Sequence, residues 1–139
     1  MKRNELVSQI MSTDLATVDV GNKLSEVRRL LRERKIHHMP VVSGAEFIGL
    51  ITASDLLRVS WGDPYSHDPR EIDVLLDTQD IRDVMQEDVR TVLPTATIRD
   101  AARLLVDGSY HCLPVVEPSG VLVGLITTTD LIRYLLDQY

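Results

Sequence analysis

The octapeptide GLITASDL at residues 49–56 returns as GLITTTDL at residues 124–131. Six of the eight positions are identical, and the two copies begin 124 − 49 = 75 residues apart. In each copy an apolar run typical of a β-strand reaches a threonine, after which the residues are typical of a helix start. Agreement in order, spacing and identity indicates an internal duplication.

The duplication extends toward the N-terminus from each octapeptide. HHMPVV at residues 37–42 matches HCLPVV at residues 111–116, with an offset of 111 − 37 = 74 residues. The offset grows by one because EPSG at residues 117–120 replaces a tighter turn in the first copy. Turns at the surface tolerate such insertions. We therefore interpret the chain as a tandem duplication of one unit of roughly 60 residues.

Both repeats carry the same predicted order of elements, α-β-α-β-β-α. The first repeat is predicted to contain a short amphipathic helix, a brief strand, a longer helix, a hairpin and a final helix, at 7–11, 16–18, 24–31, 41–51 and from Thr52 or Asp55. The second repeats them at 81–85, 90–92, 98–105, 115–126 and from Thr127 or Asp130. Thr97 and Asp100 form a capping box for its longer helix.

The fold class predicted from this order is α/β (α+β). Residues 1–60 form the first repeat, residues 61–80 a connecting loop and helix, and residues 81–139 the second repeat. Neither repeat is large enough to hold a good core alone, so we expect the two to pack sheet to sheet with pseudo-twofold symmetry. The connection begins with a turn-rich loop at 61–69, whose Trp61 and Tyr65 form either an interaction surface or a simple flank of the core. A helix is expected over 70–80.

Composition excludes several classes of function. The chain has 139 residues and a formal net charge of −6, which argues against a nucleic acid polymer as partner. A single cysteine, Cys112, rules out an internal disulfide, and no apolar run is long enough for a signal peptide or a membrane span. We expect a cytoplasmic protein without membrane contact. The sequence lacks a P-loop, a dinucleotide fingerprint and a nucleophile elbow, so we expect no enzymatic activity.

The duplicated Gly-x-x-Thr-x-x-Asp run, each copy preceded by His-x-x-Pro-Val-Val, resembles the CBS (cystathionine beta-synthase) domain signature. The resemblance covers residues 7–134 apart from the loop after residue 60. It implies a tandem CBS pair, or Bateman module, that forms a homodimer and signals to an effector protein. It further implies that clefts between the repeats bind an adenosine-containing ligand such as AMP, ADP, ATP or S-adenosylmethionine, with no required cofactor.

The resemblance also assigns candidate ligand-binding residues. Asp130 and Asp55 become acceptors for ribose hydroxyls, and Thr127 and Thr52 become phosphate donors at a helix N-terminus. A carboxylate can accept both hydroxyl hydrogens of a cis-diol, and helix N-termini favour anions. The remaining candidates are the neighbouring hydroxyls, the two motif histidines and the brief strands: Thr129, Ser54, His37, His111, Thr17, Val18, Thr91 and Val92. Family geometry pairs His37 with Asp130 and His111 with Asp55.

One family feature differs here. The residue after each motif histidine is an arginine in nucleotide-sensing relatives, but it is His38 or Cys112 in this chain. Losing the bidentate, always-charged guanidinium weakens the case for a di- or triphosphate ligand.

Each candidate also has a structural interpretation. The Thr-x-x-Asp pairs are capping boxes that satisfy backbone N–H groups at a helix start, and one residue can do both. The histidines can be partly buried structural residues, Cys112 a small core residue, and His37-His38 makes no convincing metal site. The basic run Arg28, Arg29, Arg32, Arg34 and Lys35 is either a solvated helix face or a phosphate funnel. The alternative function is a structural dimerisation module without a physiological ligand.

Overall fold

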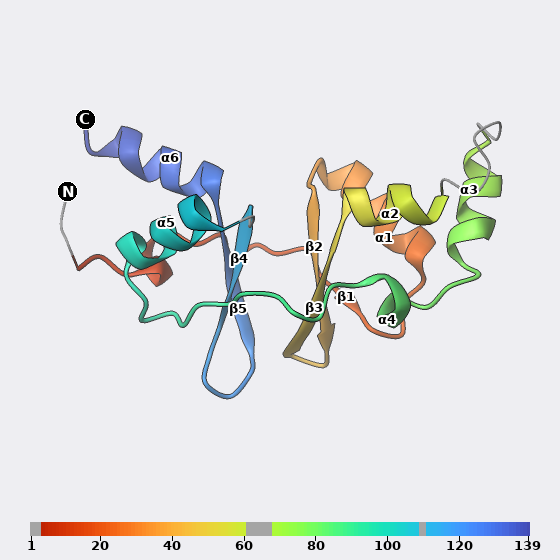
Figure 1. Cartoon of the computed structure of the whole chain (residues 1–139), viewed down its shortest axis with the longest axis horizontal. Coiled ribbons are helices and arrows are strands. Elements are labelled where there is room, and N and C mark those ends of the chain that lie inside the picture. Colours follow the sequence, from red (N-terminus) through yellow and green to blue (C-terminus); the bar gives the residue numbers. More distant parts are fainter. Residues whose placement is uncertain (1–3, 61–67, 109–110) are drawn as a thin grey trace. The chain divides into compact units, whose positions relative to one another are not determined.

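The computed structural model of the chain describes residues 4–60, 68–108 and 111–139 (Figure 1). The chain folds as two compact units. Unit 1 consists of Met1–Leu15, Ala45–Phe47 and Val89–Tyr139, and unit 2 consists of Ala16–Gly44 and Ile48–Asp88. Unit 2 therefore holds most of the first repeat, and unit 1 holds most of the second.

Unit 2 is built around a three-stranded sheet among its described residues. Its elements are β1 (Val18–Asp19), α1 (Leu24–Arg34), β2 (His38–Ser43), β3 (Glu46–Thr52), α2 (Ala53–Ser60), α3 (Pro69–Leu76) and α4 (Ile81–Val84). The strand order is β1-β2-β3, and β1 runs parallel to β2 with Val18 opposite Val41. The helix α1 buries Leu24, Val27 and Leu31 at three- and four-residue spacing, as an amphipathic helix over a core should.

Unit 1 repeats this plan in a shorter form. Its elements are the 3-10 helix η1 (Val7–Gln9), α5 (Ile98–Asp107), β4 (Cys112–Val116), β5 (Leu122–Thr127) and α6 (Thr128–Asp137). β4 and β5 are antiparallel, with Leu113 opposite Ile126, and both of these side chains are fully buried. Figure 1 shows α5 and α6 on the same side of this hairpin, and α5 packs on β4 while α6 packs on β5.

Each unit is completed by a short segment from the start of the other repeat. In unit 1, Ser12 exchanges two backbone hydrogen bonds with Leu125 of β5, at 2.9 and 3.0 Å. In unit 2, Gln86 exchanges two with Leu50 of β3, at 2.8 and 3.0 Å. We call residues 11–12 and 85–86 the crossing segments. They are equivalent by the repeat offset, since 86 − 12 = 74.

The crossing segments explain the glycine of the repeated motif. A Cβ atom on Gly49 would lie 2.8 Å from Met85 Sδ and 3.0 Å from the Gln86 carbonyl oxygen. On Gly124 it would lie 2.8 Å from Met11 Cγ. A Cβ atom at either position would therefore require the methionine side chain and the backbone carbonyl of the crossing segment to shift, and glycine avoids this.

Several predicted elements are confirmed and others are corrected. The two long helices begin at Leu24 and Ile98 as predicted, and the final helices begin at Ala53 and Thr128. The predicted helix over 7–11 is wrong in type and length: it is the three-residue η1, because the backbone of Ser12 pairs with Leu125 of β5. The predicted strand at 90–92 is reduced to a single bridge between Val92 and Val115.

The helix in the connection between the repeats is also shorter than predicted. Asp68 caps α3 by accepting a hydrogen bond from the Arg70 N–H at 2.9 Å, and the helix ends at Leu76 instead of residue 80. The predicted loop with Trp61 and Tyr65 falls mainly on residues 61–67, outside the described residues. Among the helices that the structure describes, none has the length and apolar character needed to cross a bilayer.

Candidate functional site

The two motif threonines and aspartates form reciprocal caps at helix starts. Thr127 Oγ1 accepts the Asp130 N–H at 3.2 Å, and Asp130 Oδ2 accepts the Thr127 N–H at 2.9 Å. Thr52 and Asp55 repeat the arrangement at the start of α2, at 3.2 and 2.8 Å. The structural interpretation as capping boxes is therefore confirmed in both repeats. At Thr97, the hydroxyl accepts the Asp100 N–H at 3.1 Å, as expected for a helix cap.

Both motif aspartates are buried. Asp55 is 1% exposed and Asp130 is 5% exposed, and among the described residues no other polar or charged side chain is buried. A helix cap needs no burial, because most capping carboxylates lie at the surface in water. A buried carboxylate must instead be compensated by hydrogen bonds or by an opposite charge, so the partners of these two groups define the candidate sites.

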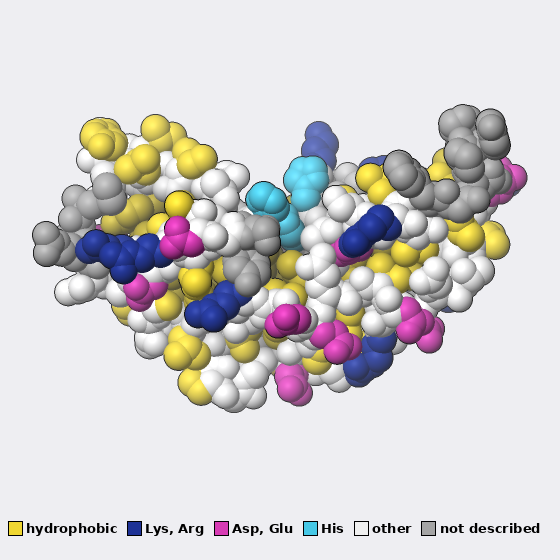
Figure 2. All heavy atoms as spheres, in the orientation of Figure 1, with side chains coloured by type: hydrophobic (Ala, Val, Ile, Leu, Met, Phe, Trp, Pro, Cys, Tyr) yellow, Lys and Arg dark blue, Asp and Glu magenta, His cyan; other side chains and the backbone are white. Residues whose placement is uncertain are grey.

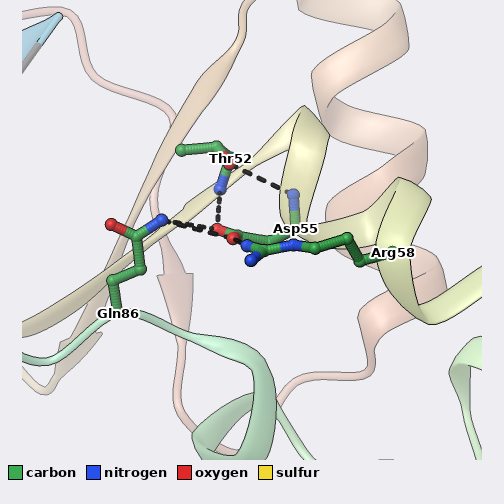
Figure 3. Close-up of polar contacts among 4 residues, drawn as sticks. All are labelled: Thr52, Asp55, Arg58 and Gln86. Atoms are coloured by element: carbon green, nitrogen blue, oxygen red, sulfur yellow. Dashed lines mark hydrogen bonds and ion pairs between the residues drawn. The ribbon is translucent and has the colours of Figure 1, made fainter. Parts of the chain in front are cut away.

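Asp55 is surrounded by donors from three parts of unit 2 (Figure 3). Gln86 Nε2 lies 3.2 Å from Asp55 Oδ1 and 3.2 Å from Oδ2. Arg58, one turn further along α2, forms an ion pair with Oδ1. Together with the Thr52 N–H on Oδ2, these contacts engage both carboxylate oxygens.

The residues around Asp130 are the repeat equivalents of those around Asp55, but they make fewer close contacts with the carboxylate. Its Oδ2 accepts from the N–H and the hydroxyl of Thr127, at 2.9 and 3.1 Å. Its Oδ1 accepts only from the Ser12 hydroxyl at 3.2 Å, among the described residues. Arg133 Nη1 lies 3.7 Å from Oδ1, beyond a good hydrogen bond.

The predicted hydroxyl neighbours lie at the same helix starts. Thr127 and Thr52 are half-buried, whereas Thr129 and Ser54 are exposed in the first turns of α6 and α2. The first turn of a helix has backbone N–H groups without a partner inside the helix, and it lies at the positive end of the helix dipole. Hydroxyls placed here can donate to an anion in addition to those amides.

The brief-strand candidates divide between core and surface. Val18 and Val92 are 3% and 8% exposed and belong to the cores of their units, so their side chains are committed to packing. Thr17 is exposed. Thr91 and Val92 line an open cavity of about 670 Å³ in unit 1 together with α5 residues such as Arg103.

The histidine candidates are both exposed side chains. This contradicts the alternative that they are partly buried structural residues. The His37 carbonyl oxygen accepts the Ala53 N–H at 3.0 Å, which ties the motif histidine to the start of α2 through its backbone. The predicted pairings of His37 with Asp130 and His111 with Asp55 join different units and stay predictions.

Two of the five residues of the basic run on and just after α1 form ion pairs. Arg28 forms an ion pair with Asp73 of α3 at 3.0 Å, and Arg29 lies 3.9 Å from Glu33. The remaining members, Arg32, Arg34 and Lys35, are exposed. This pattern agrees with a solvated helix face.

Cys112 is a core residue, as one interpretation of the sequence held. It is 3% exposed. Burial, and secondarily the negative charge of Asp130, raises the pKa of its thiol to about 12. The thiol is therefore protonated at neutral pH and unsuited to nucleophilic chemistry. Within residues 4–60, 68–108 and 111–139, no group of three or more His, Cys, Asp or Glu side chains could hold a metal ion.

Apart from Thr127, the side chains that contact the buried carboxylates were not among the candidates predicted from the sequence. Arg58 and Arg133 are equivalent by the offset 133 − 58 = 75, and each lies three residues after a motif aspartate. That repeat identity was an available signal. Ser12 and Gln86 differ between the repeats and reach the aspartates only through the crossing segments, so no local pattern pointed to them.

Comparison with known proteins identifies the repeats. The family model described as CBS domain matches residues 7–62 and 81–137. An inosine-5'-monophosphate dehydrogenase of Korarchaeum cryptofilum is 32% identical over 117 residues, which is 84% of this chain and 21% of that enzyme. A homoserine O-acetyltransferase of Methanohalobium evestigatum is 27% identical over 128 residues, 91% of this chain and 23% of that enzyme. The chain thus spans less than a quarter of either relative.

The chain also resembles a solved structure over nearly its full length. The crystal structure of CBSX2 of Arabidopsis thaliana in complex with AMP has a TM-score of 0.80 and 25% sequence identity, covering 96% of this chain and 98% of that one. Because the agreement covers 96% of this chain, it includes both repeats. The chain therefore belongs to the CBS domain family and carries a tandem pair of these domains.

Proposed function

We propose that this CBS pair is a regulatory module that binds an adenosine-containing ligand beside Asp130, Asp55 or both, and that an effector protein reads the resulting change. The observation that carries the proposal is the pair of buried carboxylates, each at the N-terminus of a helix. The likeness to CBSX2, whose structure contains AMP, supports the choice of ligand class. A position between the two repeats, expected from the sequence, stays a prediction.

The chemistry of each helix start suits a nucleoside monophosphate. A carboxylate at the first turn accepts hydrogens from the two ribose hydroxyls. The amides and hydroxyls of Thr128 and Thr129 in unit 1 offer donors to a phosphate at the positive end of the helix dipole, whereas both donors of Thr127 already contact Asp130. S-adenosylmethionine would use the same ribose contact without the phosphate contact, so the relative affinities of AMP and S-adenosylmethionine report which part of the site dominates.

Regulation is proposed in place of catalysis. The enzymes that resemble this chain match it over less than a quarter of their length, so their activities are not carried over to it. A ligand shifts a conformational equilibrium only if it binds one state more tightly than the other. The proposal therefore requires that the ligand change a measurable property of the protein besides occupancy, such as its assembly or its affinity for an effector.

We propose that the assembly is a homodimer formed through unit 1. Four apolar side chains of α5 and α6 are exposed, and we call them the α5/α6 face: Val106 (81%), Ile132 (54%), Leu135 (41%) and Leu136 (68%). Figure 2 shows hydrophobic side chains gathered over α6. The spacing of three and four residues along α6 gives one stripe, which can pair with the same stripe of a second copy about a twofold axis.

Unit 2 supports this choice of face, because there α3 covers part of the equivalent helices, although Leu57 of α2 stays 60% exposed. The helix α3 packs on α1 and α2 with Leu76 fully buried. Ser25 donates to Asp77 of the α3 C-cap from both its N–H and its hydroxyl, at 3.0 and 2.8 Å. By the repeat offset, the exposed Val106 of α5 corresponds to Arg32 of α1. The apolar face therefore occurs in the unit that has no α3 of its own.

Calorimetric titration of nucleotide-stripped protein tests the ligand proposal. AMP, ADP, ATP and S-adenosylmethionine are titrated separately, and melting temperature is measured with each ligand in excess. We expect heat and a raised melting temperature with at least one of them, because a ligand that binds only the folded state stabilises it. Asp130→Asn should weaken that binding, whereas Asp137→Asn at the other end of α6 should not. If none of the four ligands gives heat or raises the melting temperature, a structural dimerisation module becomes the better description of the protein.

A further inference from the structure

The two motif aspartates are equivalent in sequence but not in their contacts. The threonine cap, the aspartate and the arginine one turn later are identical in both units. The crossing segment is the variable part, and it places Gln86 against Asp55 but Ser12 against Asp130. The contact that the crossing segment makes with each carboxylate therefore differs by one pair of residues, Gln86 and Ser12.

Gln86 saturates the Asp55 carboxylate. An ionised carboxylate has about four acceptor positions. At Asp55 the Gln86 amide donates to both oxygens at 3.2 Å, the Thr52 N–H occupies Oδ2 and Arg58 pairs with Oδ1. With these four contacts, no acceptor position is left for a ribose diol. A diol can bind only after a donor has left, and Gln86 is the donor that engages both oxygens.

Ser12 leaves the Asp130 carboxylate partly available. Oδ1 receives only the serine hydroxyl at 3.2 Å among the described residues, and Arg133 is too distant for a good hydrogen bond. A serine hydroxyl can rotate and exchange its donor role for an acceptor role without moving its backbone. An incoming ribose hydroxyl could therefore donate to Oδ1 while Ser12 turns toward the ligand.

The backbones of both crossing segments are held by the same kind of pairing. The two segments therefore differ only in how far their side chains leave the aspartate free to bind a ligand. Gln86 is held by two backbone bonds to Leu50, and Ser12 by two to Leu125. Displacing Gln86 from Asp55 would not require the strand pairing to break. The glutamine side chain is the element that can move.

We infer that the two sites are unequal: Asp130 is the open site, and Gln86 is a built-in competitor that keeps the Asp55 site closed to a ribose diol at low ligand concentration. This inference rests on the proposed function and deepens it. Gln86 acts as a specificity-determining residue for site occupancy, because it competes for the same carboxylate oxygens as the ligand.

Exchanging the two residues provides the test, with AMP as the probe. The wild-type chain is expected to bind one AMP per chain in the tighter phase of a calorimetric titration. Gln86→Ser should strengthen the second phase roughly ten-fold or more, since one hydrogen bond to a charged group is worth about that factor. Ser12→Gln should weaken the first phase by a similar factor. Both variants keep the backbone pairing, and their melting temperatures check that they fold.

The outcomes separate this inference from the proposed function. Two equal sites in the wild type, or a Gln86→Ser variant that binds as the wild type does, would overturn the inference and leave the ligand proposal standing. The inference also fails if Asp55→Asn abolishes the tighter phase and Asp130→Asn does not. Absence of AMP binding in the wild type and in Gln86→Ser alike would overturn both.

Discussion

Met11 passes directly over Gly124, so closely that a Cβ atom on this glycine would lie 2.8 Å from Met11 Cγ and 3.1 Å from the Ser12 carbonyl oxygen. Met85 and Gly49 have the same relationship in unit 2. The motif glycine is thus a packing requirement of the crossing segments.

Substitution of these glycines should destabilise the protein. Gly124→Ala and Gly49→Ala each force a methionine and a backbone carbonyl to move, and overpacking of this kind costs about 1–3 kcal/mol. Chemical denaturation measures the loss. Gly21→Ala is the matched control, because its nearest neighbour, Asp19 Oδ1, lies at an ordinary 3.6 Å. Equal stability of Gly124→Ala and Gly21→Ala would show that the crossing segment is not tightly packed.

Stability should fall at alkaline pH because of Cys112. Burial raises the pKa of its thiol to about 12 in the folded protein, from an ordinary value of 9.0. Above pH 9 the unfolded chain loses this proton while the folded chain keeps it, so the free energy of unfolding decreases as pH rises from about 9 toward 12. Below pH 9 the thiol does not make the free energy of unfolding depend on pH. Denaturation at several pH values measures the effect.

Cys112→Ala isolates the contribution of the thiol. In this variant the free energy of unfolding should decrease less steeply between pH 9 and 12, because the thiol no longer contributes. The contributions of all other groups should stay. In the wild type, a thiol reagent such as a disulfide dye should react slowly at pH 8 and rapidly after unfolding, because only the thiolate attacks. Fast labelling of the folded chain would contradict the buried position of Cys112.

The helix α3 should be an integral part of unit 2. Leu76 is fully buried among α1 and α2 residues, so Leu76→Ala should cost about 2–5 kcal/mol. Val74 lies two residues earlier on the same helix but is 69% exposed, and Val74→Ala should change the free energy of unfolding little. If the two variants lose the same stability, α3 does not pack on the unit as described.

Local sequence patterns predicted the elements whose causes are local. The apolar spacing from Leu24 to Leu31 and the Thr-x-x-Asp caps are contained within one turn or a few turns of chain, and these predictions are confirmed. The crossing segments could not be found in this way. The pairing of Ser12 with Leu125 joins residues far apart in sequence, and nothing in residues 7–12 specifies which strand will accept them.

The same limit applies to the candidate site. The aspartates were identified from the repeated motif, but their burial depends on side chains from a distant part of the chain, such as Gln86 on Asp55. Each carboxylate serves as a helix cap, and its remaining acceptor positions decide whether it can also accept hydrogens from a ligand. Counting those positions requires coordinates.

The dimer proposal makes a prediction with an internal control. Ile132→Asp places a charge in the α5/α6 face, where burying it against a second copy would be costly, so this variant should be monomeric. Leu57 is the equivalent residue of unit 2, since 132 − 57 = 75, and it is similarly exposed, at 60% against 54%. Leu57→Asp should therefore leave the assembly unchanged. Sedimentation velocity over a range of concentrations measures the mass of each species. A wild-type chain that stays monomeric would remove the proposed dimer, and a Leu57→Asp variant that dissociates would place the interface on unit 2 instead.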